Sequence, residues 1–182
     1  MVDRISALAG LEMPLEFGPD LAMAEHRPGS IWQITAWPDR LAEAGAAAAM
    51  ACGADAAPGP LTAVDGAKGE LLRIDPVRWL WVGETAQTAP DIGGAGTVLD
   101  LSHARTVIRI TGARAPDLMA RMVPLDLRPT AFGPGRVATS GIHHVAVTLQ
   151  GRENGVDLYC FRSFGRAIWE HLTETAAQFA LA

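Results

Sequence analysis

Two adjacent histidines, His143 and His144, are the residues of this sequence whose types most suggest chemistry. Imidazoles bind transition metals and transfer protons near neutral pH, so the pair suggests a metal site or an acid–base site. The surrounding stretch, SGIHHVAVTLQG (140–151), alternates in a way that predicts a strand. Successive strand side chains point to opposite faces, so both rings reach one ion only from a turn or bulge. We therefore expect no joint metal site, with one ring facing the core or a partner and the other facing water.

The other polar residues form no recognised catalytic motif. IGGAGT (92–97) precedes a strand rather than a helix, so it reads as a linker and not as a phosphate-binding loop. The serines lack a glycine-flanked elbow, and Cys52 and Cys160 are expected to be small apolar residues in a reducing compartment. Seven aspartates stand singly near turns or element ends, where capping and Asx-turns are the usual roles: Asp65, Asp75, Asp91, Asp100, Asp117, Asp126 and Asp157. We thus predict no catalytic, cofactor-binding or metal-binding residue, and a binding or assembly module rather than an enzyme.

Composition narrows the classes of partner. The chain has 182 residues, enough for one domain, or one domain of two similar halves, with a sizeable core. Its net charge is −5 and its arginines are scattered, which disfavours a nucleic-acid partner. The longest apolar run, AGAAAAMACGA, is too short to span a membrane, and the N-terminal segment shows no export signal. We therefore expect a cytoplasmic protein.

The first half of the chain combines strands with one alanine-rich helix. Runs of aromatic and β-branched residues predict strands at SIWQITAW (30–37), ELLRID (70–75) and RWLWVG (78–83). Between the first two, PDRLAEAGAAAAMAC (38–52) predicts a helix that starts at a proline and packs through Leu41 and its alanines.

The second half repeats this order with clearer signals. A strand at 105–111 is ended by Gly112, and a helix at 113–123 has the packing face Ala115, Leu118, Met119 and Met122. Strands follow at RVATSG, HHVAVTL and VDLYCF. The last helix is expected to start at Ser163 as its N-cap, with the apolar face Phe164, Ile168, Trp169, Leu172, Ala176 and Phe179.

Strands and helices are intermingled without the regular alternation of a parallel sheet. We therefore expect an α+β fold built from two related strand–helix–strand–strand units. The whole chain, 1–182, would be a single domain with an N-terminal extension at 1–29, a first half at 30–92 and a second half at 97–180.

Four of the five tryptophans lie in the first half: Trp32, Trp37, Trp79 and Trp81. Trp79 and Trp81 share parity in one predicted strand and therefore share a face. Two interpretations stay open. The rings form a core stack, or they form an exposed aromatic strip that serves as a candidate partner interface.

The segment LDLSHARTVIRITGARAPDLMARMVPLDL, which begins at residue 99, resembles the opening of the folate-binding domain of the glycine-cleavage T protein. In that family a D-x-S-H segment enters a strand, a glycine ends it, a helix follows, and a DL pair closes the helix. FGPGRVATSGIHHVAVTL and DLYCFRSFGRAIWEHL continue the resemblance in order and spacing. The likeness covers about residues 70–180 and implies a folate-binding-domain-like fold.

Within that superfamily the chain is most similar to the gamma subunit of heterotetrameric sarcosine oxidase. That family is also short and has a tryptophan-rich segment in its first half, which LRIDPVRWLWVG (72–83) resembles. In the T protein, the strand pair corresponding to SGIHHVAVTL carries adjacent aspartates, and one carboxylate contacts the folate. Both carboxylates are absent here, and imidazole does not supply the same fixed negative charge. The two histidines thus mark a lost site.

The resemblance implies a non-catalytic gamma subunit that acts in assembly and stability of a sarcosine oxidase complex. That complex oxidatively demethylates sarcosine to glycine, yielding formaldehyde or methylene-tetrahydrofolate and hydrogen peroxide. The implied partners are the alpha, beta and delta subunits, and the implied cofactors of the complex, none bound by this chain, are FAD, FMN, NAD and tetrahydrofolate. Two alternatives stay open. One is a free-standing folate-dependent aminomethyltransferase or folate-binding protein of the same fold, and the other is a gamma-like protein that self-associates.

Overall fold

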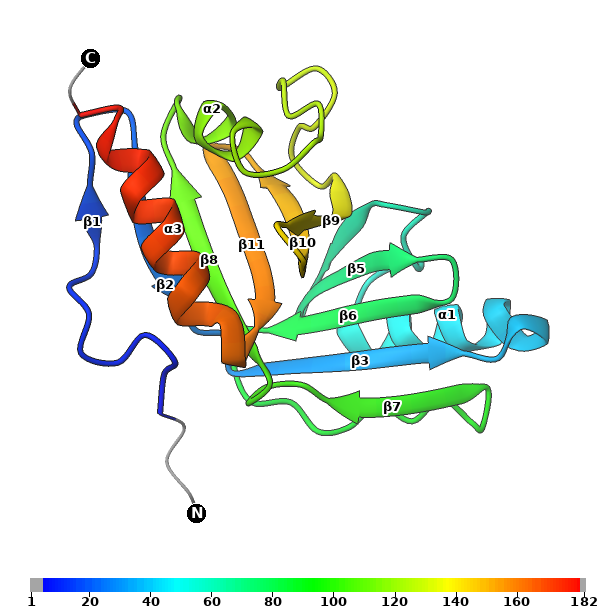
Figure 1. Cartoon of the computed structure of the whole chain (residues 1–182). Coiled ribbons are helices and arrows are strands. Elements are labelled where there is room, and N and C mark those ends of the chain that lie inside the picture. The colour runs from blue at the N-terminus through cyan, green and yellow to red at the C-terminus, as the bar shows by residue number, and fades with distance from the viewer. Residues whose placement is uncertain (1–4, 181–182) are drawn as a thin grey trace. The chain divides into compact units, whose positions relative to one another are not determined.

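The structure, a computed structural model, describes residues 5–180, and these form two compact units (Figure 1). The first unit consists of residues 27–103 and 135–137, and the second of the remaining described residues. Each unit has its own sheet and its own hydrophobic core. The chain is rich in strands and has few helices, so the expected α+β class is confirmed.

The unit around residues 27–103 contains a five-stranded antiparallel sheet of order β4-β5-β6-β3-β7. Its strands are β3 (Ser30–Ala36), β4 (Ala63–Gly66), β5 (Gly69–Asp75), β6 (Arg78–Gly83) and β7 (Gly96–Asp100). The predicted helix is present as a 3-10 turn, η1 (Pro38–Arg40), that leads into α1 (Leu41–Cys52). Gly53 ends α1 in the left-handed conformation, with a φ of 78°, and its N–H donates back to the last helical turn.

One face of this sheet packs against α1. The helix turns its smallest residues toward the sheet, and the sheet offers large ones in return. The buried helix residues are Ala44, Gly45, Ala48, Ala49 and Cys52. The main sheet residues in the same core are Ile34, Leu71, Trp79 and Trp81. Small residues let the helix approach closely enough for the indole rings to fill the space between the two layers.

The second unit contains a six-stranded sheet of order β1-β2-β8-β11-β10-β9. Its strands are β1 (Leu15–Glu16), β2 (Ala22–His26), β8 (Arg105–Thr111), β9 (Val137–Ile142), β10 (Val145–Arg152) and β11 (Gly155–Phe161). Its helices are α2 (Ala115–Ala120) and α3 (Gly165–Ala177), and the 3-10 turn η2 (Arg162–Phe164) precedes α3. Gly112 directly follows the end of β8, as predicted. The position requires glycine, because a Cβ there would lie 2.0 Å from the carbonyl oxygen of Asp20.

The core of this unit lies between one face of its sheet and the helices α2 and α3 (Figure 1). Alternate residues of β8, β10 and β11 point into it, which is the period expected of half-buried strands. The predicted α2 face, Ala115, Leu118, Met119 and Met122, is buried, as are Ile168, Trp169, Leu172, Ala176 and Phe179 of the last helix and the residues after it.

The two sheets share one connectivity. In each, a strand is followed by a helix and then by three further strands, so that β3-α1-β4-β5-β6 corresponds to β8-α2-β9-β10-β11. The strand orders also correspond, as β4-β5-β6-β3 and β9-β10-β11-β8. The sequence predicted the repeat, but it indicated only two strands after the helix of the first unit. The missing strand is β4, whose four residues are too few to give a clear pattern.

Several predicted boundaries differ from the structure. Ser163 is not an N-cap: it lies inside η2, α3 begins at Gly165, and no side chain caps that helix. Phe164 is not part of the buried helix face, because it also belongs to η2 and is 44% exposed. The short strands β1 and β2, within the expected N-terminal extension, and β7, which begins inside the expected linker, were not predicted. No helix in residues 5–180 is long and apolar enough to cross a membrane.

Candidate functional site

The two adjacent histidines form the turn between β9 and β10, so the predicted strand through both is wrong. His143 has a φ of 52°, a conformation that a tight hairpin turn requires and a strand does not allow. Both side chains are exposed, and their ring centroids are 6.2 Å apart. The alternation of the sequence therefore begins at Val145, one residue after the pair.

His143 has a different partner, which the sequence analysis missed. Its Nε2 lies 3.2 Å from Nε2 of His171 on α3, so one ring donates a hydrogen bond and the other accepts it. His171 follows the buried Ile168 by three residues, which places it beside the buried face of α3. Among residues 5–180, no three histidine, cysteine or acidic side chains gather as ligands of a metal ion would.

The D-x-S-H segment at the end of β7 has a structural role. Asp100 Oδ1 accepts a hydrogen bond from the backbone N–H of Ser102 at 2.8 Å. The buried Ser102 hydroxyl in turn accepts from the backbone N–H of Ile31 at 2.9 Å. His103 is exposed. The aspartate and serine of this motif therefore end one strand and satisfy a donor of its neighbour.

Three more of the singly placed aspartates form Asx-turns, as predicted. The carboxylates of Asp75, Asp91 and Asp126 each accept from the backbone N–H two residues further on, at 2.9, 2.9 and 3.2 Å respectively. These side chains are committed to local backbone structure.

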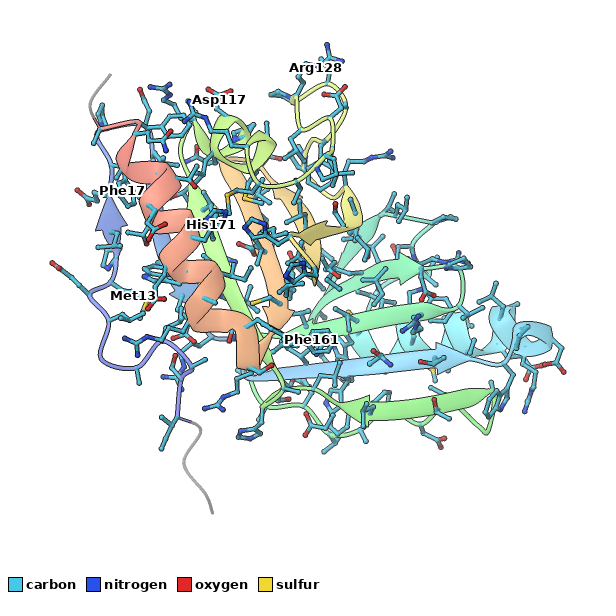
Figure 2. The ribbon with its side chains drawn as sticks, in the orientation of Figure 1. Met13, Phe17, Asp117, Arg128, Phe161 and His171 are labelled. Atoms are coloured by element: carbon cyan, nitrogen blue, oxygen red, sulfur yellow. The ribbon has the colours of Figure 1, made fainter. Side chains whose placement is uncertain are left out.

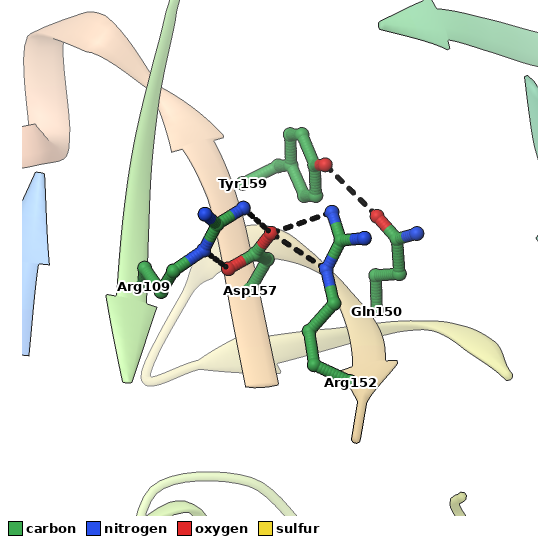
Figure 3. A network of polar contacts seen from close by, with 5 residues as sticks. All are labelled: Arg109, Gln150, Arg152, Asp157 and Tyr159. Atoms are coloured by element: carbon green, nitrogen blue, oxygen red, sulfur yellow. Dashed lines mark hydrogen bonds and ion pairs between the residues drawn. The ribbon is translucent and has the colours of Figure 1, made fainter. Parts of the chain in front are cut away.

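Asp157 differs from these turn aspartates, because it lies inside β11 and its side chain is fully buried (Figure 3). Arg109 of β8 holds both carboxylate oxygens, with Nε–Oδ1 and Nη2–Oδ2 distances of 2.8 Å. Arg152 of β10 donates to Oδ2 at 2.8 Å from Nε and lies 2.7 Å away through Nη2. In the same cluster, the Tyr159 hydroxyl donates to Gln150 Oε1 at 2.9 Å.

The charge of Asp157 is fixed by this arrangement. Burial alone would raise the pKa of its carboxyl, but the hydrogen bonds and positive charges of Arg109 and Arg152 outweigh burial and hold that pKa below its usual value. The hydrogen bond to Asp157 likewise raises the pKa of Arg109. A carboxylate held by two guanidinium groups is a poor proton acceptor, so Asp157 joins three strands rather than acting as a general base.

Both cysteines are buried and unpaired, as the sequence predicts. Burial raises the pKa of the Cys52 thiol to about 11 and that of the Cys160 thiol to about 12. The thiolate is the nucleophilic form, so neither residue is suited to nucleophilic chemistry near neutral pH.

The structure separates the four tryptophans proposed as a partner interface. Trp79 and Trp81 are 1% and 3% exposed and lie in the core beneath α1, with the half-buried Trp32 packed against that core. The Trp32 and Trp81 indoles donate to the carbonyl oxygens of Gln87 and Lys68. Trp37, at 47% exposed, is the member of the four with substantial surface to offer.

A groove of about 770 Å³ runs along α1. The helix contributes small and apolar residues that include Gly45, Ala46 and Met50, and Trp79 of β6 also lines the groove. Two charged residues, Asp55 and Arg73, line it. The groove is lined mainly by apolar side chains and is suited to apolar contact.

Sequence reasoning also missed an exposed aromatic pair where β11 passes into α3. Phe161 and Phe164 are each 44% exposed, and Figure 2 shows Phe161 at the start of α3. The guanidinium of Arg105 lies 4.1 Å from the centroid of the Phe161 ring. The available signal was the F-R-S-F run itself, which places two phenylalanines beside an arginine at the junction of a predicted strand and a predicted helix.

Comparison with known proteins finds three sequence relatives, all of them gamma subunits of sarcosine oxidase. No protein-family model matches the chain. Sarcosine oxidase subunit gamma of Arthrobacter sp is 33% identical over 85 residues, covering 40% of this chain and 42% of the relative. The subunit of the same name from Corynebacterium sp. (strain P-1) is 33% identical over 85 residues, covering 43% and 42%. That from Corynebacterium sp. (strain U-96) is 32% identical over 122 residues, covering 64% and 59%.

The chain thus spans less than half the length of the first two relatives that it matches. A chain of the solved heterotetrameric sarcosine oxidase from Corynebacterium sp. U-96 has a TM-score of 0.80, with 98% of this chain and 97% of that chain covered at 23% identity. This comparison shows that the fold is shared. The resemblance to sarcosine oxidase gamma subunits is confirmed by the three sequence relatives.

Proposed function

We propose that this chain is the gamma subunit of a heterotetrameric sarcosine oxidase and that it serves the assembly and stability of that complex. The observation that carries the proposal is the sequence similarity to three gamma subunits of that name, at 32–33% identity. The shared fold along nearly the whole chain supports it.

In this proposal the complex, not this chain, carries the chemistry. The complex oxidatively demethylates sarcosine to glycine and yields formaldehyde, or methylene-tetrahydrofolate, and hydrogen peroxide. FAD, FMN, NAD and tetrahydrofolate bind to the alpha, beta and delta subunits. The two-unit architecture is that of a T-protein-like folate-binding domain whose folate site has been lost.

The polar groups of the chain support a non-catalytic role. Asp157 is neutralised by two arginines, and other aspartates serve Asx-turns. Both thiols are buried and protonated at neutral pH. These groups maintain the fold, and what the chain offers other molecules is its surface.

The test is co-expression of this chain, carrying an affinity tag, with the alpha, beta and delta subunits of the same organism. We expect all four to copurify in fixed ratio, and we expect the yield of assembled complex to fall when this chain is omitted. The turnover of any complex assembled without it should change less than the yield. The matched control is an unrelated tagged protein of similar size.

Two results would contradict the proposal. In one, the large subunits assemble fully and turn over sarcosine unchanged when the chain is omitted. In the other, the chain copurifies with none of them and transfers a one-carbon unit to tetrahydrofolate by itself, which would favour a free-standing aminomethyltransferase.

A further inference from the structure

The connection between β11 and α3 displays apolar side chains on the surface of its unit. Phe161 and Phe164 are each 44% exposed, and Ile5 is 67% exposed. Arg162, between the two aromatics, donates from Nη2 to the backbone oxygen of Ile5 at 2.9 Å, so the N-terminal segment lies beside this connection. Large exposed apolar groups that adjoin one another on a protein surface mark an interaction site more often than isolated ones do.

Positive charge accompanies these side chains. Arg105 and Phe161 are partners in the β8–β11 register, and the guanidinium stacks 4.1 Å from the ring centroid. The Arg162 side chain extends from the same connection. We call these five residues the aromatic–arginine patch: Ile5, Arg105, Phe161, Arg162 and Phe164.

Among residues 5–180, Arg105 has no counter-charge. In residues 5–180 no carboxylate lies within ion-pair distance of it, although it is half-buried. Burial lowers the pKa of Arg105, and this effect outweighs the opposing influence of the buried Cys160 thiol. A positive surface on a chain of net charge −5 is suited to a partner's carboxylate.

We propose that the aromatic–arginine patch is the surface through which this chain docks on another subunit of the sarcosine oxidase complex, at an apolar face flanked by acidic residues. The inference rests on the function proposed above. Aromatic and arginine side chains are the residue types that concentrate binding energy in protein interfaces. Docking of a second copy through a two-fold axis would place the same positively charged patch on both sides of the contact, and this like-charge contact disfavours self-association at the patch.

The experiment measures binding of the purified chain to the other three subunits assembled without it, by biolayer interferometry. The double variant Phe161→Ser/Phe164→Ser should raise the Kd about 30-fold or more, and Arg105→Glu should raise it about 10-fold or more. Arg105→Lys keeps the positive charge and should retain most of the affinity. The controls are Leu99→Ser, an exposed apolar side chain in the other unit, and Arg128→Glu, a charge reversal on an exposed loop. Both controls should bind like the wild type.

Thermal melts show whether each variant is folded. Salt titration of the wild type is a second measurement that needs no variant. We expect the Kd to rise as ionic strength rises, because salt screens the attraction between the arginines and the partner's carboxylates. If the wild type does not bind the assembled subunits, the proposed function and this inference both fail. If the wild type binds and the patch variants bind equally well, the inference alone is overturned. It is also overturned if the patch variants abolish self-association of the isolated chain but leave its affinity for the subunits unchanged.

Discussion

Asp157 shows how a carboxylate can be fully buried in this chain without serving catalysis. Its two oxygens are shared between Arg109 and Arg152, which project from the strands on either side of β11. The sequence placed this aspartate with the turn aspartates, because nothing local distinguishes it from them. Its partners are 48 and 5 residues away, and only the pairing of β8, β11 and β10 brings them together.

Replacing Asp157 with asparagine should lower the free energy of unfolding by about 2–4 kcal/mol at pH 7, because two guanidinium groups lose a buried counter-charge. The folded-state pKa of Asp157 lies below its unfolded value, so its contribution is present above the unfolded pKa and is lost as pH falls through the folded pKa. Urea unfolding at pH 7 and at pH 3 measures both effects.

The matched control is Asp126→Asn, which removes an exposed ion pair with Arg128 and should leave unfolding unchanged. The difference in the free energy of unfolding between the wild type and Asp157→Asn should be smaller at pH 3 than at pH 7. A difference that stays constant across this range would show that the Asp157 charge does not stabilise the fold.

The cysteines give a second test at this scale. Burial raises the thiol pKa values to about 11 and 12, so both thiols are protonated at pH 8. We expect no reaction of Cys52 or Cys160 with a disulfide reagent in the folded chain at pH 8, and reaction of both in denaturant. Rapid labelling of either thiol without denaturant would contradict the buried positions.

At the scale of elements, α1 and the tryptophan strands are complementary. The alanines of α1 are spaced so that Ala44 and Ala48 recur every four residues on the sheet side, while Ala46 points away from the core. Because the opposing side chains are the large Trp79 and Trp81, there is little room for a larger residue on the helix.

Replacing Ala48 with leucine should therefore destabilise the chain by about 1–3 kcal/mol through overpacking. Leucine in place of Ala46, one half-turn away and exposed, is the control and should leave stability unchanged or slightly improved. Chemical denaturation monitored by tryptophan fluorescence reports on this core directly. Equal effects of the two substitutions would show that α1 does not pack by its small face.

The elements that could be predicted from sequence are those with a sustained period. RWLWVG and RTVIRIT match β6 and β8 residue for residue, because the first is a continuous run of aromatic and branched apolar residues and the second alternates in sequence. The strands β1, β4 and β7 are two to five residues long and mostly not buried, so they carry too little pattern. The predicted start of the last helix failed for a related reason, since the 3-10 turn η2 leads into it without a capping side chain.

The same reasoning explains which parts of the candidate site were found. Asp100 of the D-x-S-H motif and the turn aspartates act on neighbours in sequence, so their geometry could be anticipated. The contact of His143 with His171 and that of Arg105 with Phe161 join residues 28 and 56 positions apart. Such pairs are set by tertiary structure, and a single sequence holds no local signal for them.

At the scale of the whole molecule, both units repeat one connectivity, and this repeat describes the architecture of the chain without assigning it an activity. The two units share one strand order, yet a shared scaffold does not determine what binds to it. In this chain the hairpin turn that the T-protein resemblance associates with a folate carboxylate carries His143 and His144 instead. Asp157, the fully buried carboxylate of the neighbouring strand, is already held by two arginines.

We therefore expect the purified chain to bind tetrahydrofolate with a Kd weaker than 1 mM, equivalent to less than about 4 kcal/mol of binding free energy. Isothermal titration calorimetry of the isolated chain measures this, with an active T protein as the positive control under the same conditions. Replacing His144 with aspartate tests the cause, because a carboxylate restored in the exposed turn should strengthen binding if its loss removed the site. Micromolar binding by the unmodified chain would contradict the lost-site interpretation and would favour a folate-binding protein of the same fold.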